Sequence, residues 1–194
     1  MIYLDTSVVL AQVLAKDRQP DETLWAETLD RRREGRQISP RLRPGYEPMR
    51  MLHDPAVRTS IEDRLNTLRP DSPRQWGTLT ADQMLWHANQ LLESSLGEGT
   101  LPAEKLPLPA PLMRFMLLYL PWPKSAPTNR GAVPTGEHDF EAERARCRAL
   151  IDRFVSRPLN GAWPVDPSFG KVNGKFNSKL HAKHLDHHFR QFSA

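Results

Sequence analysis

The sequence contains a single cysteine, Cys147, among 194 residues. An internal disulfide is therefore excluded, and a lone thiol suits the reducing cytosol, so we expect a cytoplasmic protein. Long hydrophobic runs are also missing: the longest apolar stretch, residues 112–122, is interrupted by Arg114 and Pro121 and is too short to cross a bilayer. A secretory signal peptide is not expected either, because Asp5 interrupts the first apolar stretch and no basic segment precedes it.

A strong excess of charge of one sign is missing too. The chain has 27 Lys and Arg against 23 Asp and Glu, which gives a net charge of +4. The basic run at residues 31–33 is followed at once by Glu34 and is typical of a solvated surface. So small a surplus predicts neither a nucleic-acid nor a membrane partner, and leaves a small molecule as the expected one.

From residue 54 onward, apolar residues recur at helical spacing in four segments separated by helix-ending signals. No strand is expected after residue 50, so the pattern predicts an all-α bundle. Eight of the 18 prolines lie between Leu101 and Pro134, which predicts a long irregular connection between the second and third helices, with a short helix at Met113–Leu120. The four helices are expected from Asp54 to before Pro70, from Thr80 to Gly97, from Asp139 to Val155, and from Asn173 to Gln191.

Histidines are concentrated in the last predicted helix, where four of the seven fall within residues 181–188. His184 and His188 are spaced i and i+4, on the same face as Leu185 and Phe192. Two imidazoles at this spacing emerge about 6 Å apart on one side of a helix and can chelate one metal ion. Unpartnered imidazoles on an inward face would be costly, and a metal removes that cost.

A chelating pair alone makes a loose site, so a third ligand should come from another helix. His87 is the best candidate, because it lies in the middle of the second predicted helix beside the apolar stripe that contains Met84 and Leu91. Three neutral imidazoles leave a coordination position open for water or substrate, which is typical of catalytic rather than structural sites.

Spacing alone leaves other interpretations open. His87 could be a hydrogen-bonded histidine at the edge of the core, and His184 with His188 could be cations that stabilise a helix C-terminus. The pair His184 and His187 is a further option, although His187 is turned away from the apolar face. The remaining histidines are expected to have local or surface roles: His181 beside the site, and His187, His53 and His138 on the surface.

The segment from residue 49 to the C-terminus resembles the DinB-like superfamily, in particular an uncharacterised bacterial branch of it. The last helix is the most specific part of the resemblance. The stretches that carry it are Met51–Val57, Asp71–Gly77, Met84–His87, Ala126–Thr128, Asp139–Arg144, Phe169–Lys171 and Lys183–Phe192.

This resemblance implies an up-and-down four-helix bundle in which His87, His184 and His188 hold a divalent ion such as zinc, nickel or iron. Some DinB-like proteins are S-transferases that use low-molecular-weight thiols, and a bound metal would lower the pKa of such a thiol. We therefore expect a thiol-dependent S-transferase or a related metal-dependent enzyme. The alternative is a non-catalytic metal-binding or interaction bundle, with a homodimer formed through exposed helix faces.

Three positions depart from the DinB-like pattern. Phe176 and Asn177 stand where the family has an acidic residue and Trp, and Asp166 replaces a histidine before the last helix. These differences concern substrate contacts more than metal binding. Cys147 lies on the apolar seam of the third predicted helix, so it is expected to be buried rather than nucleophilic, and no carboxylate occupies a convincing general-base position.

Residues 1–29 resemble something else, the opening strand and helix of a PIN-domain ribonuclease of the VapC type, with Asp5 at the position of its first metal-binding acid. That chemistry needs several convergent carboxylates, and the pattern stops after residue 30. We therefore expect residues 1–48 to be an incomplete PIN-like fragment, a fusion or a mis-set start, and residues 49–194 to be the DinB-like domain. A remnant VapC-like ribonuclease is the less favoured function.

Overall fold

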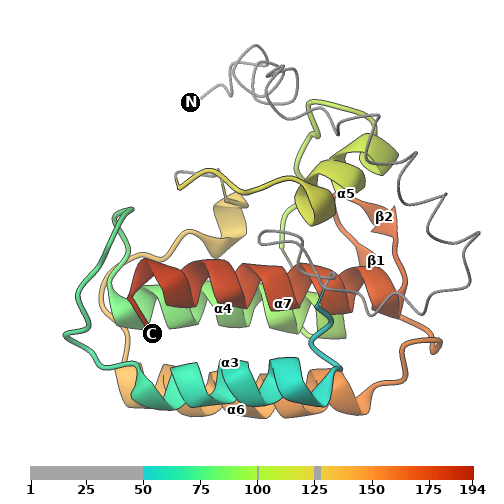
Figure 1. Ribbon diagram of the computed structural model, residues 1–194. Coiled ribbons are helices and arrows are strands. Elements are labelled where there is room, and N and C mark those ends of the chain that lie inside the picture. The colour runs from blue at the N-terminus through green and yellow to red at the C-terminus, as the bar shows by residue number, and fades with distance from the viewer. Residues whose placement is uncertain (1–49, 100, 125–127) are drawn as a thin grey trace, which may run out of the picture. The chain divides into compact units, whose positions relative to one another are not determined.

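The computed structural model describes residues 50–99, 101–124 and 128–194, which belong to one compact unit spanning Met49–Ala194 (Figure 1). The strand and helix expected at residues 1–29, Asp5 and the basic run at 31–33 lie outside the described residues, so the division at residue 48 stays a prediction. The elements in chain order are α3 (Pro55–Thr67), α4 (Ala81–Leu96), α5 (Ala110–Tyr119), η2 (Arg130–Ala132), α6 (Phe140–Ser156), β1 (Val165–Asp166), β2 (Gly170–Lys171) and α7 (Gly174–Gln191).

Local signals in the sequence set the ends of the four long helices. The Asp54 side chain accepts a hydrogen bond from the Ala56 N–H, which caps α3 directly before Pro55. Gln83 accepts from the Thr80 N–H at 3.2 Å, as a capping box requires. After α4 the chain turns at Gly97, whose φ of 83° lies in the left-handed region that glycine adopts readily. The side chains of Asp139 and Asn173 cap α6 and α7 in the same way as Asp54 caps α3.

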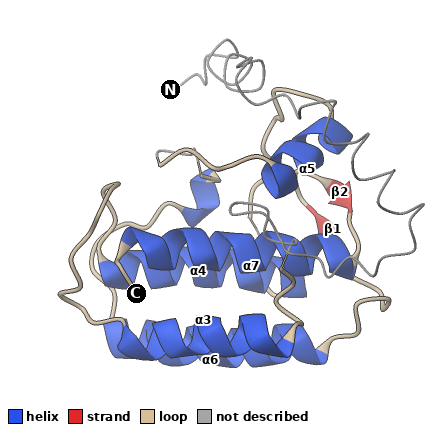
Figure 2. Ribbon diagram, viewed as in Figure 1, coloured by secondary structure: helices blue, strands red, loops and turns tan. Residues whose placement is uncertain are grey.

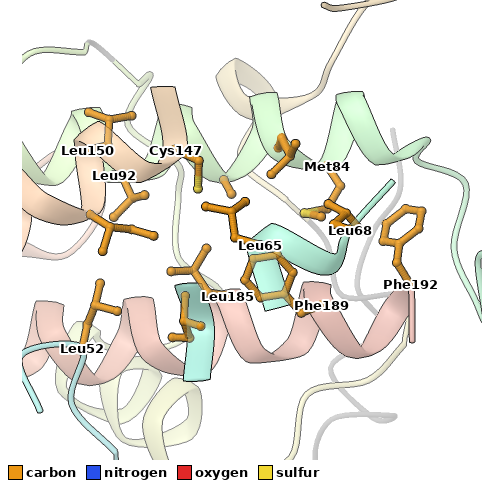
Figure 3. Packing of buried hydrophobic residues seen from close by; sticks show 14 of the residues in the cluster. Leu52, Leu65, Leu68, Met84, Leu92, Cys147, Leu150, Leu185, Phe189 and Phe192 are labelled. Atoms are coloured by element: carbon orange, nitrogen blue, oxygen red, sulfur yellow. The ribbon is translucent and has the colours of Figure 1, made fainter. Parts of the chain in front are cut away.

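The helices α3, α4, α6 and α7 pack around one hydrophobic core (Figures 1 and 2), and α4 and α6 share the largest contact. Figure 3 shows how side chains from all four meet inside it. Burying each large aliphatic or aromatic side chain stabilises the fold by about 1.5–3 kcal/mol. The all-α class is thus confirmed for the described residues. Fully buried members include Leu65 of α3, Leu92 of α4, Cys147 and Ile151 of α6, and Phe189 of α7.

Two sequence predictions need correction. The expectation of no strand after residue 50 is wrong, because β1 and β2 form an antiparallel hairpin in which Val165 pairs with Lys171. Strands of two residues are too short to show an alternating pattern, and the positive φ of 71° at Gly170 makes the turn. The short helix in the Pro-rich connection begins at Ala110, three residues before the predicted start at Met113.

Helix α5 is apolar yet contributes no buried residue to the core. It packs against α7, and the link is Lys183, whose Nζ donates to the carbonyl oxygens of Leu117, Leu118 and Leu120. A single ammonium group thereby satisfies carbonyls left open at the C-terminal end of α5. Among the described helices, none combines the length and apolar character that crossing a membrane requires.

Candidate metal centre

The three histidines predicted to bind a metal meet at one point. His87 comes from the middle of α4, and His184 and His188 come from successive turns of α7. The Nε2 atom of His184 lies 3.0 Å from Nε2 of His87 and 3.0 Å from Nε2 of His188. The potential ligand atoms of the three residues all lie within 4.8 Å of one another, so a single ion could contact all of them.

The site is formed between α4, which carries His87, and α7, which carries His184 and His188. In α4, His87 is 4% exposed and follows the fully buried Met84 and Leu85. In α7, His184 is also 4% exposed and precedes Leu185, which belongs to the core. His188, one turn later, is only partly buried and marks the more open side of the centre. The site therefore lies at the edge of the core.

Hydrogen bonds at the outer ring nitrogens determine which tautomers are present. The Ala132 carbonyl oxygen lies 2.7 Å from Nδ1 of His87, and Oε1 of Gln191 lies 3.0 Å from Nδ1 of His188. A carbonyl oxygen can only accept, so both Nδ1 atoms carry the proton and both Nε2 atoms present a lone pair inward. Two lone pairs consequently face Nε2 of His184.

This arrangement is poorly satisfied by the protein alone. The Nε2 of His184 can supply at most one hydrogen to the two facing lone pairs, and its buried Nδ1 has no hydrogen-bond partner among the described residues. A metal ion accepts lone pairs from all three Nε2 atoms at once, with ligand distances of about 2.0–2.1 Å for zinc. The donor set therefore fits a divalent ion better than it fits an internal hydrogen-bond network.

The electrostatics also favour the metal-binding form of the histidines. Burial lowers the pKa of His87 and of His184, and it lowers the pKa of His188 to about 3. For His184 the neighbouring imidazoles add to the effect of burial, because each would repel a second positive charge. All three rings are thus neutral at neutral pH, which is the state that binds metals. No carboxylate of the described residues joins the group of ligand atoms.

Aromatic and cationic side chains lie on the outer side of the triad. The Trp122 ring centroid lies 5.8 Å from that of His184 and 5.6 Å from that of His187. The Lys183 Nζ lies 5.2 Å from the centre of the Trp122 ring. The His187 ring centroid also lies 5.8 Å from that of Trp76. Trp122 was not predicted as a site residue, because its position between Pro121 and Pro123 is the only local signal in the sequence that distinguishes it.

His181 was expected to have a local role, and it stands apart from the triad. It is 2% exposed, and its Nε2 lies 2.7 Å from Oγ of Ser95 in α4. Its ring packs edge-on against Phe154 with centroids 4.9 Å apart. Burial lowers the pKa of His181 to about 3, so it is a neutral core residue.

The prediction that His53, His138 and His187 are surface residues is wrong, because all three are half-buried. His53 places Nδ1 at 2.9 Å from Oγ of Ser178 and Nε2 at 2.9 Å from the backbone oxygen of Arg157. His138 stacks on the Trp86 ring with centroids 5.1 Å apart, and the His187 ring lies near the rings of Trp76 and Trp122. These partners come from distant parts of the chain, so helical periodicity could not indicate them.

The remaining expectations about site residues concern packing. Cys147 is fully buried, and burial together with nearby Glu143 raises its thiol pKa to about 12, which excludes it as a nucleophile at neutral pH. Phe176 and Asn177 are buried at the start of α7. Asp166 accepts hydrogen bonds from the backbone N–H groups of Ser168 and Phe169 and so stabilises the hairpin turn.

Comparison with known proteins adds no assignment. No protein-family model, curated protein or solved structure matches the chain. The DinB-like and PIN-like resemblances are thus carried by the sequence motifs alone. The function must therefore be inferred from the chain's own residues. Among the described residues, the histidine triad is the feature that indicates metal-dependent chemistry.

Proposed function

We propose that this chain is a divalent-metal-binding protein of the DinB-like type, with His87, His184 and His188 as the metal ligands. The observation that supports this most strongly is the convergence of three Nε2 atoms whose lone pairs the protein itself cannot satisfy. The four packed helices and the origin of the ligands from α4 and α7 agree with the arrangement that the DinB-like resemblance implies.

Zinc, nickel or iron would suit this donor set. Neutral imidazole nitrogens are typical ligands of these ions, whereas magnesium and calcium require oxygen ligands. Because no carboxylate of the described residues reaches the ligand group, the protein would leave the charge of the ion uncompensated. An anionic ligand from outside the chain, such as a thiolate, would supply the missing negative charge.

Thiol-dependent group transfer is the activity that we propose for the centre. When bound, the ion would lower the pKa of a small thiol and so produce a nucleophile at neutral pH. The protein itself supplies no such nucleophile, because Cys147 is buried with a raised pKa. His188 is the least buried of the three ligands, so a small thiol would approach from its side.

A non-catalytic interaction protein is the second candidate, and one observation favours it. Along one face of α5, Leu112, Phe115 and Tyr119 are 45%, 51% and 57% exposed. The rings of Phe115 and Tyr119 stack with centroids 4.8 Å apart. Large exposed apolar side chains at helical spacing are typical of a surface that binds another protein, including a second copy of the chain. The PIN-like alternative rests on Asp5, outside the described residues.

Elemental analysis of the natively purified full chain tests metal binding. We expect close to one zinc, nickel or iron ion per chain in the wild type, and loss of that ion in His87→Ala and in His184→Ala. His138→Ala is the matched control, because it removes a half-buried histidine outside the triad and should leave the ion in place. A wild-type chain that takes up none of the three ions, even when they are added, would refute the proposal.

Titration of the metal-loaded protein with small thiols separates the two candidate functions. A thiol that perturbs the visible spectrum of the Co²⁺-substituted protein, together with turnover of an electrophile, supports the transferase. Metal binding without any thiol response supports the interaction protein, and self-association lost on Phe115→Ser would add to that case.

A further inference from the structure

Gln191, the last residue of α7, connects the candidate metal centre to a loop. Its side chain is 4% exposed. Its Oε1 lies 3.0 Å from Nδ1 of His188, and its Nε2 donates to the backbone oxygen of Trp76 at 2.8 Å. Its own backbone oxygen accepts from the Gln75 N–H at 2.7 Å. The loop between α3 and α4 is therefore hydrogen-bonded to this residue twice.

The contact with Trp76 determines which end of the Gln191 amide faces the histidine. A backbone oxygen can only accept, so the amide must turn its NH₂ group toward Trp76. The amide oxygen then has to face Nδ1 of His188, which in turn must carry the proton. The lone pair of His188 is thereby left on Nε2, the atom that points at the other two histidines.

Gly77 provides the space in which this amide lies. Its φ is 79°, a conformation that other residues adopt only with strain. A Cβ atom at this position would lie 2.4 Å from Nε2 of Gln191. The nearest way to relieve that overlap is to displace the Gln191 amide, which would break its contacts with Trp76 and His188. The position of the buried Gln191 amide thus depends on a glycine at position 77.

We propose that Gln191 is a positioning residue for the metal centre, which fixes the ring orientation and the tautomer of His188 and is itself oriented by the Trp76 carbonyl over Gly77. This inference rests on the proposed metal binding. Residues that hydrogen-bond to a metal-binding histidine commonly contribute about 10- to 100-fold to metal affinity. Gln191 would thus tune the affinity of the centre without contacting the ion.

Competitive titration of the full chain with Zn²⁺ and a chromophoric chelator tests this role through two substitutions. Gln191→Met keeps the approximate volume and removes both hydrogen bonds, so its Zn²⁺ affinity should fall about 10- to 100-fold. Gln191→Glu loses the donor to Trp76 but keeps an acceptor for Nδ1 of His188, so its affinity should fall less than that of Gln191→Met. A purely structural role would weaken both variants alike.

Gly77→Ala tests the same role without changing either the three histidines or Gln191, which hydrogen-bonds to His188. Its Zn²⁺ affinity should fall about tenfold, because the new methyl group displaces the Gln191 amide. Gly136→Ala is the matched control: Gly136 has a φ of 80°, so it suffers the same backbone strain, but a Cβ there would meet nothing within 4 Å. Unfolding of the metal-free variants in urea gives the stability change separately.

The outcomes separate the two proposals. A wild-type chain that binds no Zn²⁺ refutes the metal centre and this inference with it. If the wild type binds, three results each overturn the role of Gln191 alone: unchanged affinity in Gln191→Met, equal losses in Gln191→Met and Gln191→Glu, or equal losses in Gly77→Ala and Gly136→Ala. The expected pattern is a larger loss in Gln191→Met than in Gln191→Glu, and a larger loss in Gly77→Ala than in Gly136→Ala.

Discussion

Acid should destabilise the metal-free protein, and His181 offers the cleanest way to measure the effect. This residue is buried outside the triad, so replacing it with leucine leaves the three proposed ligands in place. The His181→Leu substitution removes one imidazole that the folded protein keeps neutral, while its aliphatic side chain can still pack on Phe154. We therefore expect the variant to be less sensitive to acid than the wild type.

The magnitude follows from the change in the pKa of His181 on folding. Burial lowers this pKa from 6.5 to about 3, so between these values the unfolded chain binds a proton that the folded chain does not. Stability contributed by this residue therefore falls as the pH falls through this range, by about 1.4 kcal/mol per pH unit. Between pH 7 and pH 5 the loss amounts to roughly 2 kcal/mol, a substantial part of a typical stability of about 5–15 kcal/mol.

Urea unfolding at pH 7 and pH 5, with a chelator present, measures this loss. The wild type should lose about 2 kcal/mol more than His181→Leu over that interval. Ser95→Ala is the control: it removes the partner of His181 but keeps the imidazole, so it should lower stability by about 1–3 kcal/mol without reducing the pH dependence. Equal pH dependence in His181→Leu and the wild type would show that His181 is not a buried neutral histidine.

Three further substitutions test the packing that holds the site. Leu65→Ala, at a fully buried position, should lower the free energy of unfolding by about 2–5 kcal/mol in urea titrations, and a change below 1 kcal/mol would contradict the core described above. Gly97→Ala places a Cβ 2.9 Å from Pro164 at a φ of 83°, so thermal unfolding should reveal a loss of about 1–3 kcal/mol. Lys183→Met should speed amide hydrogen exchange in α5 while leaving exchange in α6 unchanged, because Lys183 holds the end of α5.

The sequence was most informative where a local signal determines the structure. Asp54 with Pro55, Thr80 with Gln83, and Gly97 set helix ends that agree with the structure within a residue or two. The spacing of His184 and His188 depends only on helical geometry, so the relation of these two candidate ligands could be predicted. His87 was harder to place, since its approach to α7 depends on how two helices far apart in the chain pack.

Features that depend on the path of irregular segments could not be predicted. Trp122 reaches His184 because the Pro-rich connection folds back over α7, and no periodicity governs that path. Nothing in the sequence distinguishes Gln191 from other polar residues near helix ends. Its role emerges only when the loop carrying Trp76 and Gly77 is placed against it. The half-buried state of His53 has the same origin, because its partners lie more than a hundred positions away.

The wide separation of the proposed ligands along the chain has a consequence for biosynthesis. His87 and His184 are 97 positions apart. An ion bound by both would therefore connect two segments that the ribosome synthesises at different times. A growing polypeptide has only one of the three imidazoles available until α7 leaves the ribosome. One imidazole alone retains an ion poorly. The ion would therefore be acquired after α7 is synthesised, and it would then close a long loop in a chain that has no disulfide to do so.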